Sequence, residues 1–302
     1  MKTILSIGSV ALDTIETPHG SVKDQPGGSA THFSISASFF TKVNIVGIVG
    51  EDFPEEVLNL LKSREVDVDG IDIIKGGETF RWSGYYDNNM AIAHTLDTQL
   101  NVFENFNPKI PDKFKDSKLM FIGNIDPVLQ LNIIKSAGPK ELICSDTMNY
   151  WISLKNQELL EVVKASDIMI LNDQEARELT NKNNILKAAR AVMELGPLAV
   201  VIKRGENGAT IFFKDGNYFS SSAYLFEDVV DPTGAGDSFA GGFLGYLSTV
   251  SEINNKNLKK AVIYGNIMGS FNVEGFGYSR IAKLTKEDIE NRYEEMKNIS
   301  LY

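Results

Sequence analysis

The chain has few of the residues that hold disulfide frameworks and metal sites together. Among its 302 residues there is one cysteine, Cys144, which excludes an internal disulfide framework and fits a reducing compartment. The three histidines, His19, His32 and His94, are scattered and lack the spacing of metal ligands. The formal net charge of −10 gives no basic excess, so the composition argues against nonspecific binding to nucleic acid.

Long apolar segments and one common nucleotide motif are also missing. No apolar run approaches the roughly 20 residues that cross a bilayer, and we expect no signal peptide in the short apolar stretch of residues 1–8. There is no Gly-x-x-x-x-Gly-Lys-Ser/Thr run, which excludes a P-loop site. With 43% hydrophobic and 23% charged residues, the sequence predicts a cytoplasmic protein with one large domain over residues 1–302.

Strand and helix patterns alternate along most of the chain. The short apolar runs between the helices are typical of strands that are buried on both faces of a parallel sheet. The alternation therefore predicts a doubly wound α/β fold. Strands are predicted at residues 4–10, 43–49, 119–122, 142–144, 168–171, 199–203 and 209–213, and helices at 29–40, 55–62, 128–136, 156–163, 173–179, 185–195, 237–247, 258–273 and 286–297.

One region breaks this alternation. Residues 78–86 and 91–95 have strand patterns and are separated by the turn residues 87–89, which indicates a hairpin. Exposed aromatic side chains such as Trp82 and Tyr86 would suit either a decorative β-edge or a binding surface.

The segment 231–237, Asp-Pro-Thr-Gly-Ala-Gly-Asp, carries the clearest chemical signal. Gly234 and Gly236 allow unusual backbone dihedrals and the close approach of a ligand just before a predicted helix. Free amide N–H groups at a helix start attract anions, phosphate above all, and an acid in the first turn ionises easily. Asp237 could therefore take a proton from a hydroxyl group while the amides hold the phosphoryl group that the hydroxyl attacks.

Two other interpretations of this segment stay open on the residues alone. Asp237 could be a simple N-cap, and a glycine-rich helix start can serve only close packing. A dinucleotide-binding loop fits less well, because it needs a third glycine where Phe239 stands and a strand directly before the loop.

The whole segment resembles the C-terminal signature of the ribokinase-like (PfkB) carbohydrate kinase family, Asp-Pro/Thr-x-Gly-Ala-Gly-Asp. In that family the last aspartate is the catalytic base and the glycine-rich amides form the anion hole. The resemblance implies these roles for Asp237 and for Gly234, Ala235 and Gly236. It also implies a three-layer α/β/α fold with a mostly parallel sheet and a small β-sheet lid, here formed mainly by residues 11–26 and 76–100, that covers the sugar and often serves as a dimer interface.

The resemblance places the acceptor site in the N-terminal half. Asp13 follows the first predicted strand and falls at an acid that grips sugar hydroxyls in the family, and Gly27 and Gly28 fall at its Gly-Gly motif; from the residues alone, a capping acid and turn glycines are equally good interpretations. That motif continues to an Asn where this chain has His32, whose imidazole can bind a hydroxyl with a different geometry, so the acceptor stays open. Asp126 is a further candidate for a sugar contact.

ATP and Mg2+ are the cofactors that the resemblance implies. Asn172 and Glu175 open a predicted helix with a capping-box pattern, which could be purely structural. They also match the family's Asn-x-x-Glu motif, whose glutamate acts through water on the magnesium–phosphate group, and a cation that keeps its waters suits a single carboxylate.

Two further groups complete the implied site. The turn of residues 203–208 lies against the nucleotide in the family, and the charged Arg204 stands where an apolar residue is usual; its guanidinium would be favourable near phosphates. The nucleotide-side candidates are Lys203, Arg204, Gly205, Gly208 and Asn266, the last at the family's Asn near the adenine. The candidates for a monovalent cation such as K+, which some members bind, are Asp231, Thr233, Gly275 and Gly277.

The sequence thus predicts an ATP-dependent kinase that phosphorylates a hydroxymethyl group of a sugar. A nucleoside acceptor is the alternative within this class, and a non-catalytic sugar or nucleotide sensor is the alternative of a different class, since fold does not fix function. The presence of Asp237 with both glycines favours the enzyme, because a sensor does not need the base. A small-molecule acceptor is expected, with no nucleic-acid or membrane partner, and a homodimer through the lid is the candidate assembly.

Overall fold

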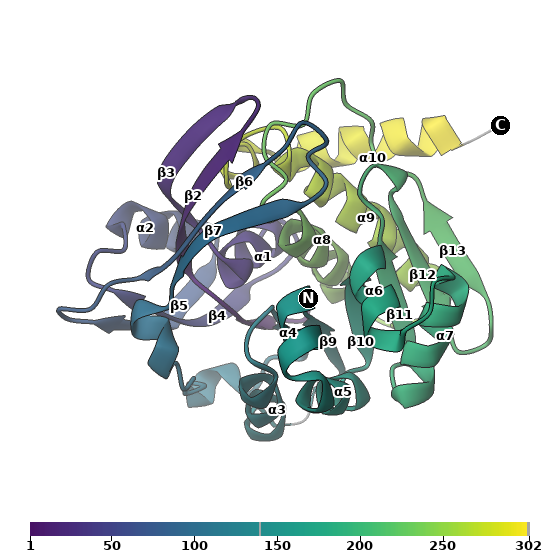
Figure 1. The fold of residues 1–302 in the computed structure, drawn as a ribbon. Helices are drawn as coiled ribbons and strands as arrows, with labels where there is room; N and C mark the ends of the chain where they lie inside the picture. Colours follow the sequence, from purple (N-terminus) through teal and green to yellow (C-terminus); the bar gives the residue numbers. More distant parts are fainter. Residues whose placement is uncertain (139, 301–302) are drawn as a thin grey trace.

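The computed structural model describes residues 1–138 and 140–300, which form a helix-covered main sheet and a second, smaller sheet (Figure 1). Within these residues the main sheet has the strand order β13-β12-β11-β10-β9-β8-β1-β4-β5. Neighbouring strands run parallel, except that β12 is antiparallel to both β11 and β13. The strands are β1 (Ile4–Ile7), β4 (Val43–Gly50), β5 (Val66–Ile74), β8 (Leu119–Ile122), β9 (Leu142–Asp146), β10 (Ile168–Asn172), β11 (Ala199–Lys203), β12 (Ala209–Phe213) and β13 (Tyr218–Ser221).

Helices cover both faces of this sheet, which explains why its inner strands are mostly apolar, whereas the edge strands β5 and β13 carry more polar residues. In β10, Ile168 and Ile170 pack into the core on one face, while Met169 and Leu171 pack into the core on the other. This is the period of two that a strand imposes on its side chains. The first face is covered by α1 (Ser29–Ala37), α2 (Glu55–Ser63), α8 (Ala235–Thr249) and α9 (Asn255–Asn272), with α10 (Lys286–Ser300) outside α9; the second is covered by α3 (Pro127–Ser136), α5 (Asn156–Ala165), α6 (Asp173–Thr180) and α7 (Ile185–Leu195).

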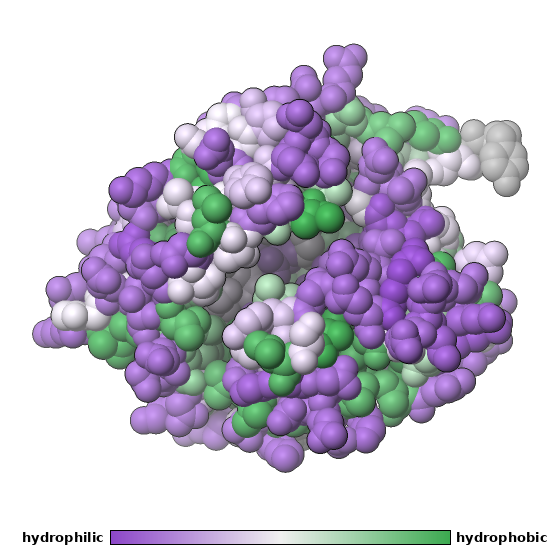
Figure 2. Space-filling model, viewed as in Figure 1, coloured by the Kyte–Doolittle hydropathy of each residue, from purple (hydrophilic) through white to green (hydrophobic). Residues whose placement is uncertain are grey.

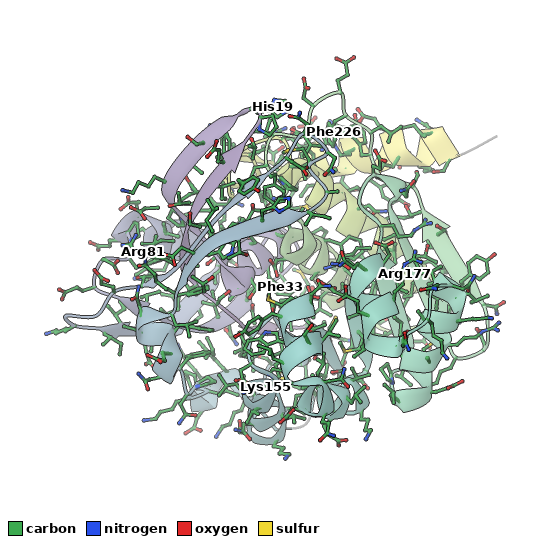
Figure 3. The ribbon with its side chains drawn as sticks, in the orientation of Figure 1. His19, Phe33, Arg81, Lys155, Arg177 and Phe226 are labelled. Atoms are coloured by element: carbon green, nitrogen blue, oxygen red, sulfur yellow. The ribbon has the colours of Figure 1, made fainter. Side chains whose placement is uncertain are left out.

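Helix α1 is fixed to the sheet by aromatic packing. The ring of Phe33 (labelled in Figure 3) stacks on Phe121 of β8 with centroids 4.1 Å apart. Every residue of α1 is buried, because α8 covers the side of α1 that faces away from the sheet. The N-terminus of α1 is thereby held firmly beside the end of β1.

The second sheet has the order β3-β2-β6-β7, and we call it the lid sheet. It consists of β2 (Ala11–Thr17), β3 (Gly20–Gly27), β6 (Phe80–Tyr86) and β7 (Ala93–Gln99). In Figure 1 it extends from the main body as an arm at the upper left. Figure 2 shows a hollow in the same face of the molecule, below this arm and above the short helix α4 (Asn149–Leu154).

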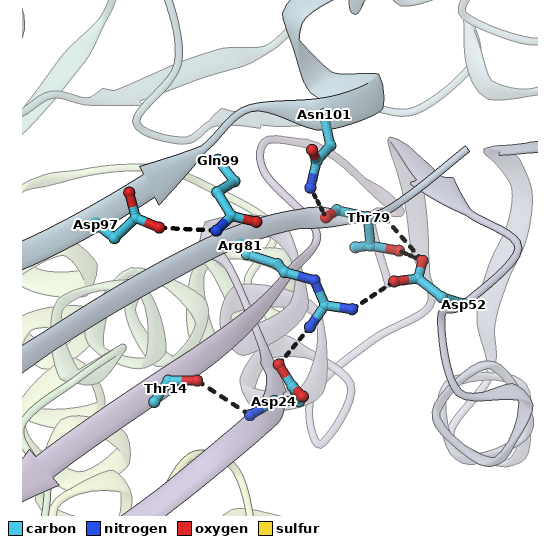
Figure 4. A network of polar contacts seen from close by, with 8 residues as sticks. All are labelled: Thr14, Asp24, Asp52, Thr79, Arg81, Asp97, Gln99 and Asn101. Atoms are coloured by element: carbon cyan, nitrogen blue, oxygen red, sulfur yellow. Dashed lines mark hydrogen bonds and ion pairs between the residues drawn. The ribbon is translucent and has the colours of Figure 1, made fainter.

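The arm is tied to the body by charged side chains (Figure 4). Arg81 of β6 pairs with Asp24 of β3 and, through Nη2, with Asp52 beyond β4 at 2.7 Å. Thr79 donates its hydroxyl to the same carboxylate, Asp52 Oδ1, at 2.6 Å. Asp52 therefore joins both the start of β6 and the Arg81 side chain to the main body.

The predicted doubly wound α/β fold with a mostly parallel sheet is confirmed, and several boundaries differ. The strand predicted at 4–10 ends at Ile7, because the chain leaves the main sheet there and begins β2 at Ala11. The helix predicted at 29–40 ends at Ala37, and the hairpin's second strand runs to Gln99. Strands β2 and β3 span the segment 11–26 that the family resemblance assigned to the lid. Strands β5 and β13 were not predicted, since their polar residues hide the apolar period, and helix α4 was not predicted, since it has only 6 residues.

None of the described helices combines the length and apolarity that crossing a bilayer requires.

Candidate active site

The carboxyl ends of three neighbouring parallel strands bring polar residues to one edge of the main sheet. Asn172, the last residue of β10, pairs in register with Lys203, the last residue of β11. Asp146, the last residue of β9, lies opposite Ile170 on the other side of β10. Ligands of open parallel sheets bind at such strand ends, and here the N-terminus of α8 reaches the same edge.

Residues 231–237, which we call the anion loop, have an irregular backbone that leads into α8. Gly234 has φ +75°, in the left-handed region, and a Cβ there would lie 2.5 Å from ring atoms of His32, so only glycine fits. The N–H of Ala235 donates to Pro232 O at 3.1 Å, and Ser238 N–H donates to Gly234 O at 2.8 Å. Among the described residues, the N–H of Gly236 has no acceptor, so it is free for an anion.

Buried polar contacts hold this loop in place. The Asn272 side chain donates to Thr233 O at 2.7 Å and accepts from the Ser238 hydroxyl at 2.9 Å. The carboxylate of Asp231 accepts from Thr233 N–H and from Gly277 N–H, each at 2.9 Å. Asp231 thus joins the anion loop to the turn that carries Gly277, and both of its oxygens are engaged.

Asp237 lies in the first turn of α8 with a pKa near neutrality. It keeps part of its surface accessible but is surrounded by protein, and this burial raises its pKa from 3.8 to about 7. The charge of Asp146 raises the pKa further, while the nearby Lys203 lowers it. A carboxyl group with this pKa can both accept and release a proton near pH 7.

Lys203 stands among three carboxylates. Its Nζ lies 3.3 Å from Asp146 Oδ2, and a Cβ on Gly236 would lie 2.8 Å from the same Nζ. Burial opposes its positive charge, but Asp146, Glu175 and Asp237 outweigh this effect and hold the Lys203 pKa above its usual value. The ammonium group is therefore directly beside the anion loop.

Glu175 closes a complete capping box at the start of α6. Its N–H donates to Asn172 Oδ1 at 2.8 Å, and its carboxylate accepts from Asn172 N–H at 2.7 Å. The residue is buried, which raises its pKa from 4.5 to about 8, against the lowering effect of Lys203. The capping box predicted from the sequence is therefore present. The other carboxylate oxygen of Glu175, Oε1, remains outside this cap.

Asp146 is a site residue that the sequence analysis missed. It is buried at the end of β9, where it accepts from Thr147 N–H at 2.8 Å and from Lys203. The apolar run that predicted this strand stops at Cys144, so the acid two residues later was not considered. An acid directly after a buried strand was the available signal.

These acids fit a hydrated magnesium ion better than a dehydrated one. Among the described residues, no group of three His, Cys, Asp or Glu side chains could hold a metal ion directly. Glu175 and Asp146 are close enough to Lys203 for their charges to shift its pKa, which places both near the anion loop. Mg2+ usually keeps several waters and takes only one or two carboxylates, so this donor set suits it.

The acceptor-side candidates meet on the other side of the anion loop. Asp13 lies in β2 of the lid sheet rather than in the main sheet, and a Cβ on Gly27 would lie 2.1 Å from its Oδ2. Gly28 has φ +90°, and a Cβ there would lie 2.5 Å from Ser9 O. Burial raises the pKa of Asp13 to about 7; Asp231 and Asp237 raise it further, against the amide of Gly28.

His32 is buried beneath the anion loop rather than open to the hollow. Only 2% of the residue is exposed, and neither ring nitrogen has a hydrogen-bond partner among the described residues. Burial lowers its pKa to about 4, against the opposing effect of the neighbouring Asn272 side chain, so the imidazole is neutral near pH 7. In this arrangement His32 supports Gly234 and does not face the solvent.

Asp126 is occupied by contacts within the protein. It caps α3 by accepting from Val128 N–H at 2.9 Å, and its other oxygen pairs with Lys155 (labelled in Figure 3) at 2.6 Å. A sugar contact would have to compete with this ion pair.

On the nucleotide side, Arg204 and Lys203 point to different neighbours. The Arg204 guanidinium donates to Asn207 O and to the Ser220 hydroxyl, both at 3.0 Å. Asn266 donates to Ser222 O at 3.0 Å and so lies beside the end of β13. Gly205 and Gly208 have φ +54° and +77° in the turn between β11 and β12, while Gly275 precedes Gly277 after α9.

The lid sheet reaches the anion loop directly. The hydroxyl groups of Tyr86 and Thr233 lie 3.2 Å apart, joining the end of β6 to the loop. Burial raises the pKa of Tyr86 to about 12, so its hydroxyl stays protonated. The hollow of Figure 2 thus has the lid sheet on one side and the main-sheet edge on the other.

Comparison with known proteins identifies the family to which the chain belongs. The model of the pfkB family carbohydrate kinases matches residues 127–283. A cytidine kinase from Thermococcus kodakarensis is 33% identical over 250 residues, which cover 81% of this chain and 88% of the relative. The chain belongs to the pfkB carbohydrate kinase family.

Other similar proteins are more distant in sequence. The probable chloroplastic fructokinase-6 of Arabidopsis thaliana is 24% identical over 312 residues, covering 90% of this chain and 77% of the relative. The crystal structure of a putative ribokinase II from E. coli in complex with ATP and Mg2+ superposes with a TM-score of 0.79 at 19% identity, over 98% and 100% of the two chains. The fold of this pfkB kinase is therefore ribokinase-like, as its signature motif predicted.

Proposed function

We propose that this kinase transfers the γ-phosphoryl group of ATP to a hydroxymethyl group, with Asp237 as the general base. The observation that supports the proposal is the position of Asp237: an acid with a pKa of about 7 in the first turn of α8, next to the free N–H of Gly236. General bases work best when their pKa is close to the pH at which they act.

The proposed transfer is a single displacement at phosphorus. The acceptor hydroxyl attacks phosphorus, its proton passes to Asp237, and the bond to the leaving oxygen of ADP breaks. The N–H groups of Gly236 and Asp237 bind the transferring phosphoryl group, while Ala235 N–H is already used by Pro232 O and shapes the loop instead. When bound, Mg2+ neutralises charge on the phosphates, and Glu175 and Asp146 would hold it through its waters.

Asp13 orients the acceptor in this proposal. As a carboxylate in the lid sheet it accepts hydrogen bonds from hydroxyl groups, which are strong because the acceptor is charged. The lid sheet then excludes water, which would otherwise react with ATP. Asp126 stays a candidate for a second hydroxyl contact, and Arg204, Gly205, Gly208 and Asn266 stay candidates for the nucleotide.

We propose the ribose of a nucleoside as the first acceptor to test, with a free sugar such as fructose as the second. The sequence analysis placed the sugar first; the 33% identity with a cytidine kinase over most of both chains now favours the nucleoside. The fructokinase relative, at 24% identity, supports the sugar. The Asn-to-His departure at His32 does not choose between them, because the imidazole lies under Gly234.

The test is ADP release, measured by a coupled assay with ATP, Mg2+ and a panel of cytidine, uridine, adenosine, ribose and fructose. The proposal expects at least one acceptor to give turnover and a phosphorylated product of the expected mass. A protein that binds these ligands but releases no ADP would instead be the non-catalytic sensor.

Three further proposals accompany the kinase. K+ would bind the backbone around Thr233, Gly275 and Gly277, with Asp231 fixing the loop, and replacing Na+ by K+ would then raise turnover.

The lid sheet would form a homodimer, which sedimentation can test. A cytoplasmic location would suit the single, buried Cys144 and can be tested by cell fractionation.

A further inference from the structure

The ammonium group of Lys203 lies close to Gly236 of the anion loop, although the loop's own hydrogen bonds do not involve Lys203. Its Nζ lies so close to Gly236 that an added Cβ there would come within 2.8 Å of it. An anion held by the N–H of Gly236 would therefore lie within a few ångström of a positive charge. Arg204, the next residue, is turned away and donates to Asn207 and Ser220.

Lys203 also keeps hydrogen-bonding capacity in reserve. An ammonium group has three donors, and among the described residues its acceptor is Asp146 Oδ2 at 3.3 Å. Charge-assisted N–H···O bonds are usually about 2.7–2.9 Å long, so this one is long and weak. Because 19% of the Lys203 side chain is exposed, a ligand can reach it.

We propose that Lys203 is a catalytic residue that binds the transferring phosphoryl group together with the Gly236 amide. The inference rests on the proposed function, because it needs the phosphoryl group to lie at the anion loop. Asp146 accepts the one hydrogen bond that the ammonium group makes among the described residues. Lys203 donates no proton: the proton of the acceptor hydroxyl goes to Asp237, and ADP leaves with the electron pair of the broken P–O bond.

The charges around the site give this contact its purpose. Asp146, Glu175 and Asp237 lie close enough to Lys203 for their charges to raise its pKa, and this negative charge alone would repel an anionic phosphoryl group held at Gly236. A positive charge beside the equatorial oxygens offsets this repulsion. Groups that are fixed in advance where charge develops are typically worth about 10²–10³-fold in turnover.

The decisive variant is Lys203→Met, which keeps the length of the side chain and removes its charge. We expect kcat to fall about 10²–10³-fold, with the dissociation constants of ADP and the acceptor changed less than threefold. Binding of ADP with aluminium fluoride and acceptor, which mimics the transferring group, should weaken by about as much as kcat falls. Lys182→Met, at an exposed lysine outside the site, should change none of these values.

Equal weakening of ADP, acceptor and the fluoride complex would overturn the proposal, because Lys203 would then be only a counter-ion for buried acids. Unchanged kcat would overturn it as well. If Lys203→Met does not fold, Lys203→Gln keeps a donor for Asp146 and undergoes the same assays with the same two outcomes. Asp237→Asn separates the claims: if it turns over normally, the proposed function fails; if it is inactive and Lys203→Met is normal, only this inference fails.

Discussion

At the scale of single residues, the site is dominated by acids whose pKa values are shifted towards neutrality. Asp13 and Asp237 reach about 7 and Glu175 about 8, and burial is the first cause in each case. Such shifts cost folding free energy whenever the group is ionised in the folded protein. Their clustering around the anion loop is what a functional site would produce, since structural acids are usually left solvated or paired.

Asp237→Asn should stabilise the ligand-free protein, and more so at higher pH. The folded pKa of about 7 lies above the usual aspartate value, so the folded protein binds more protons between these values and loses stability as pH rises through 7. The variant lacks this loss and should gain roughly 1–2 kcal/mol over the wild type between pH 5 and pH 8. Urea unfolding at both pH values measures it; an equal difference at both would contradict the shifted pKa.

Asp13→Ala tests the orientation of the site. If Asp13 binds acceptor hydroxyls, its loss should weaken the acceptor about tenfold or more, since charged hydrogen bonds are worth about 1.5–3 kcal/mol. The affinity for ATP should stay nearly unchanged. Calorimetric titration of both ligands decides the matter: weakened ATP with unchanged acceptor would show that the orientation is reversed.

The residues that the sequence could predict are those with a local motif. Asp237 and Glu175 stand out because a glycine pair and a capping pattern surround them. Asp146 has no such neighbours, and its role depends on Lys203, 57 positions away in the chain. The burial of His32 likewise depends on Gly234, which approaches it only in the folded protein.

At the scale of elements, the sequence pattern revealed individual strands better than it revealed how those strands pair. The apolar alternation predicted most main-sheet strands, but β5 carries Asp67, Asp69 and Asp72 and was hidden by them. The hairpin of β6 and β7 was visible from its turn. Its pairing with β2 was not, because that contact joins segments about 70 residues apart.

Arg81→Met should loosen the lid sheet. The substitution removes the ion pairs to Asp24 and Asp52, leaving Thr79 as the contact to Asp52. We expect the acceptor KM to rise several-fold with kcat less affected, because lid closure mainly positions the acceptor. Lys113→Met, which removes ion pairs to Asp67 and Asp69 of β5, is the matched control. Equal effects of both variants would mean that the Arg81 network is ordinary surface structure.

At the scale of the whole molecule, the proposed function assigns phosphoryl transfer to the edge of the main sheet and acceptor binding to the lid sheet. β9, β10 and β11 deliver Asp146, Asn172 and Lys203 to one edge, and α8 adds Asp237. Family membership was visible in the motif of the anion loop and is shown by the family model and the cytidine kinase relative, whereas the choice of acceptor is proposed to depend on a few side chains around Asp13. The fold and the reaction class could therefore be predicted from the sequence, and the acceptor could not.

The central claim is that Asp237 is the base of an ATP-dependent transfer, and one measurement tests it most directly. The wild type and Asp237→Asn are compared for formation of phosphorylated product, by mass spectrometry, with the best acceptor of the panel under saturating ATP and Mg2+. The account predicts that the variant keeps its fold and its ATP affinity but makes product about 10²–10⁴-fold more slowly. Product formation at a near wild-type rate would contradict it.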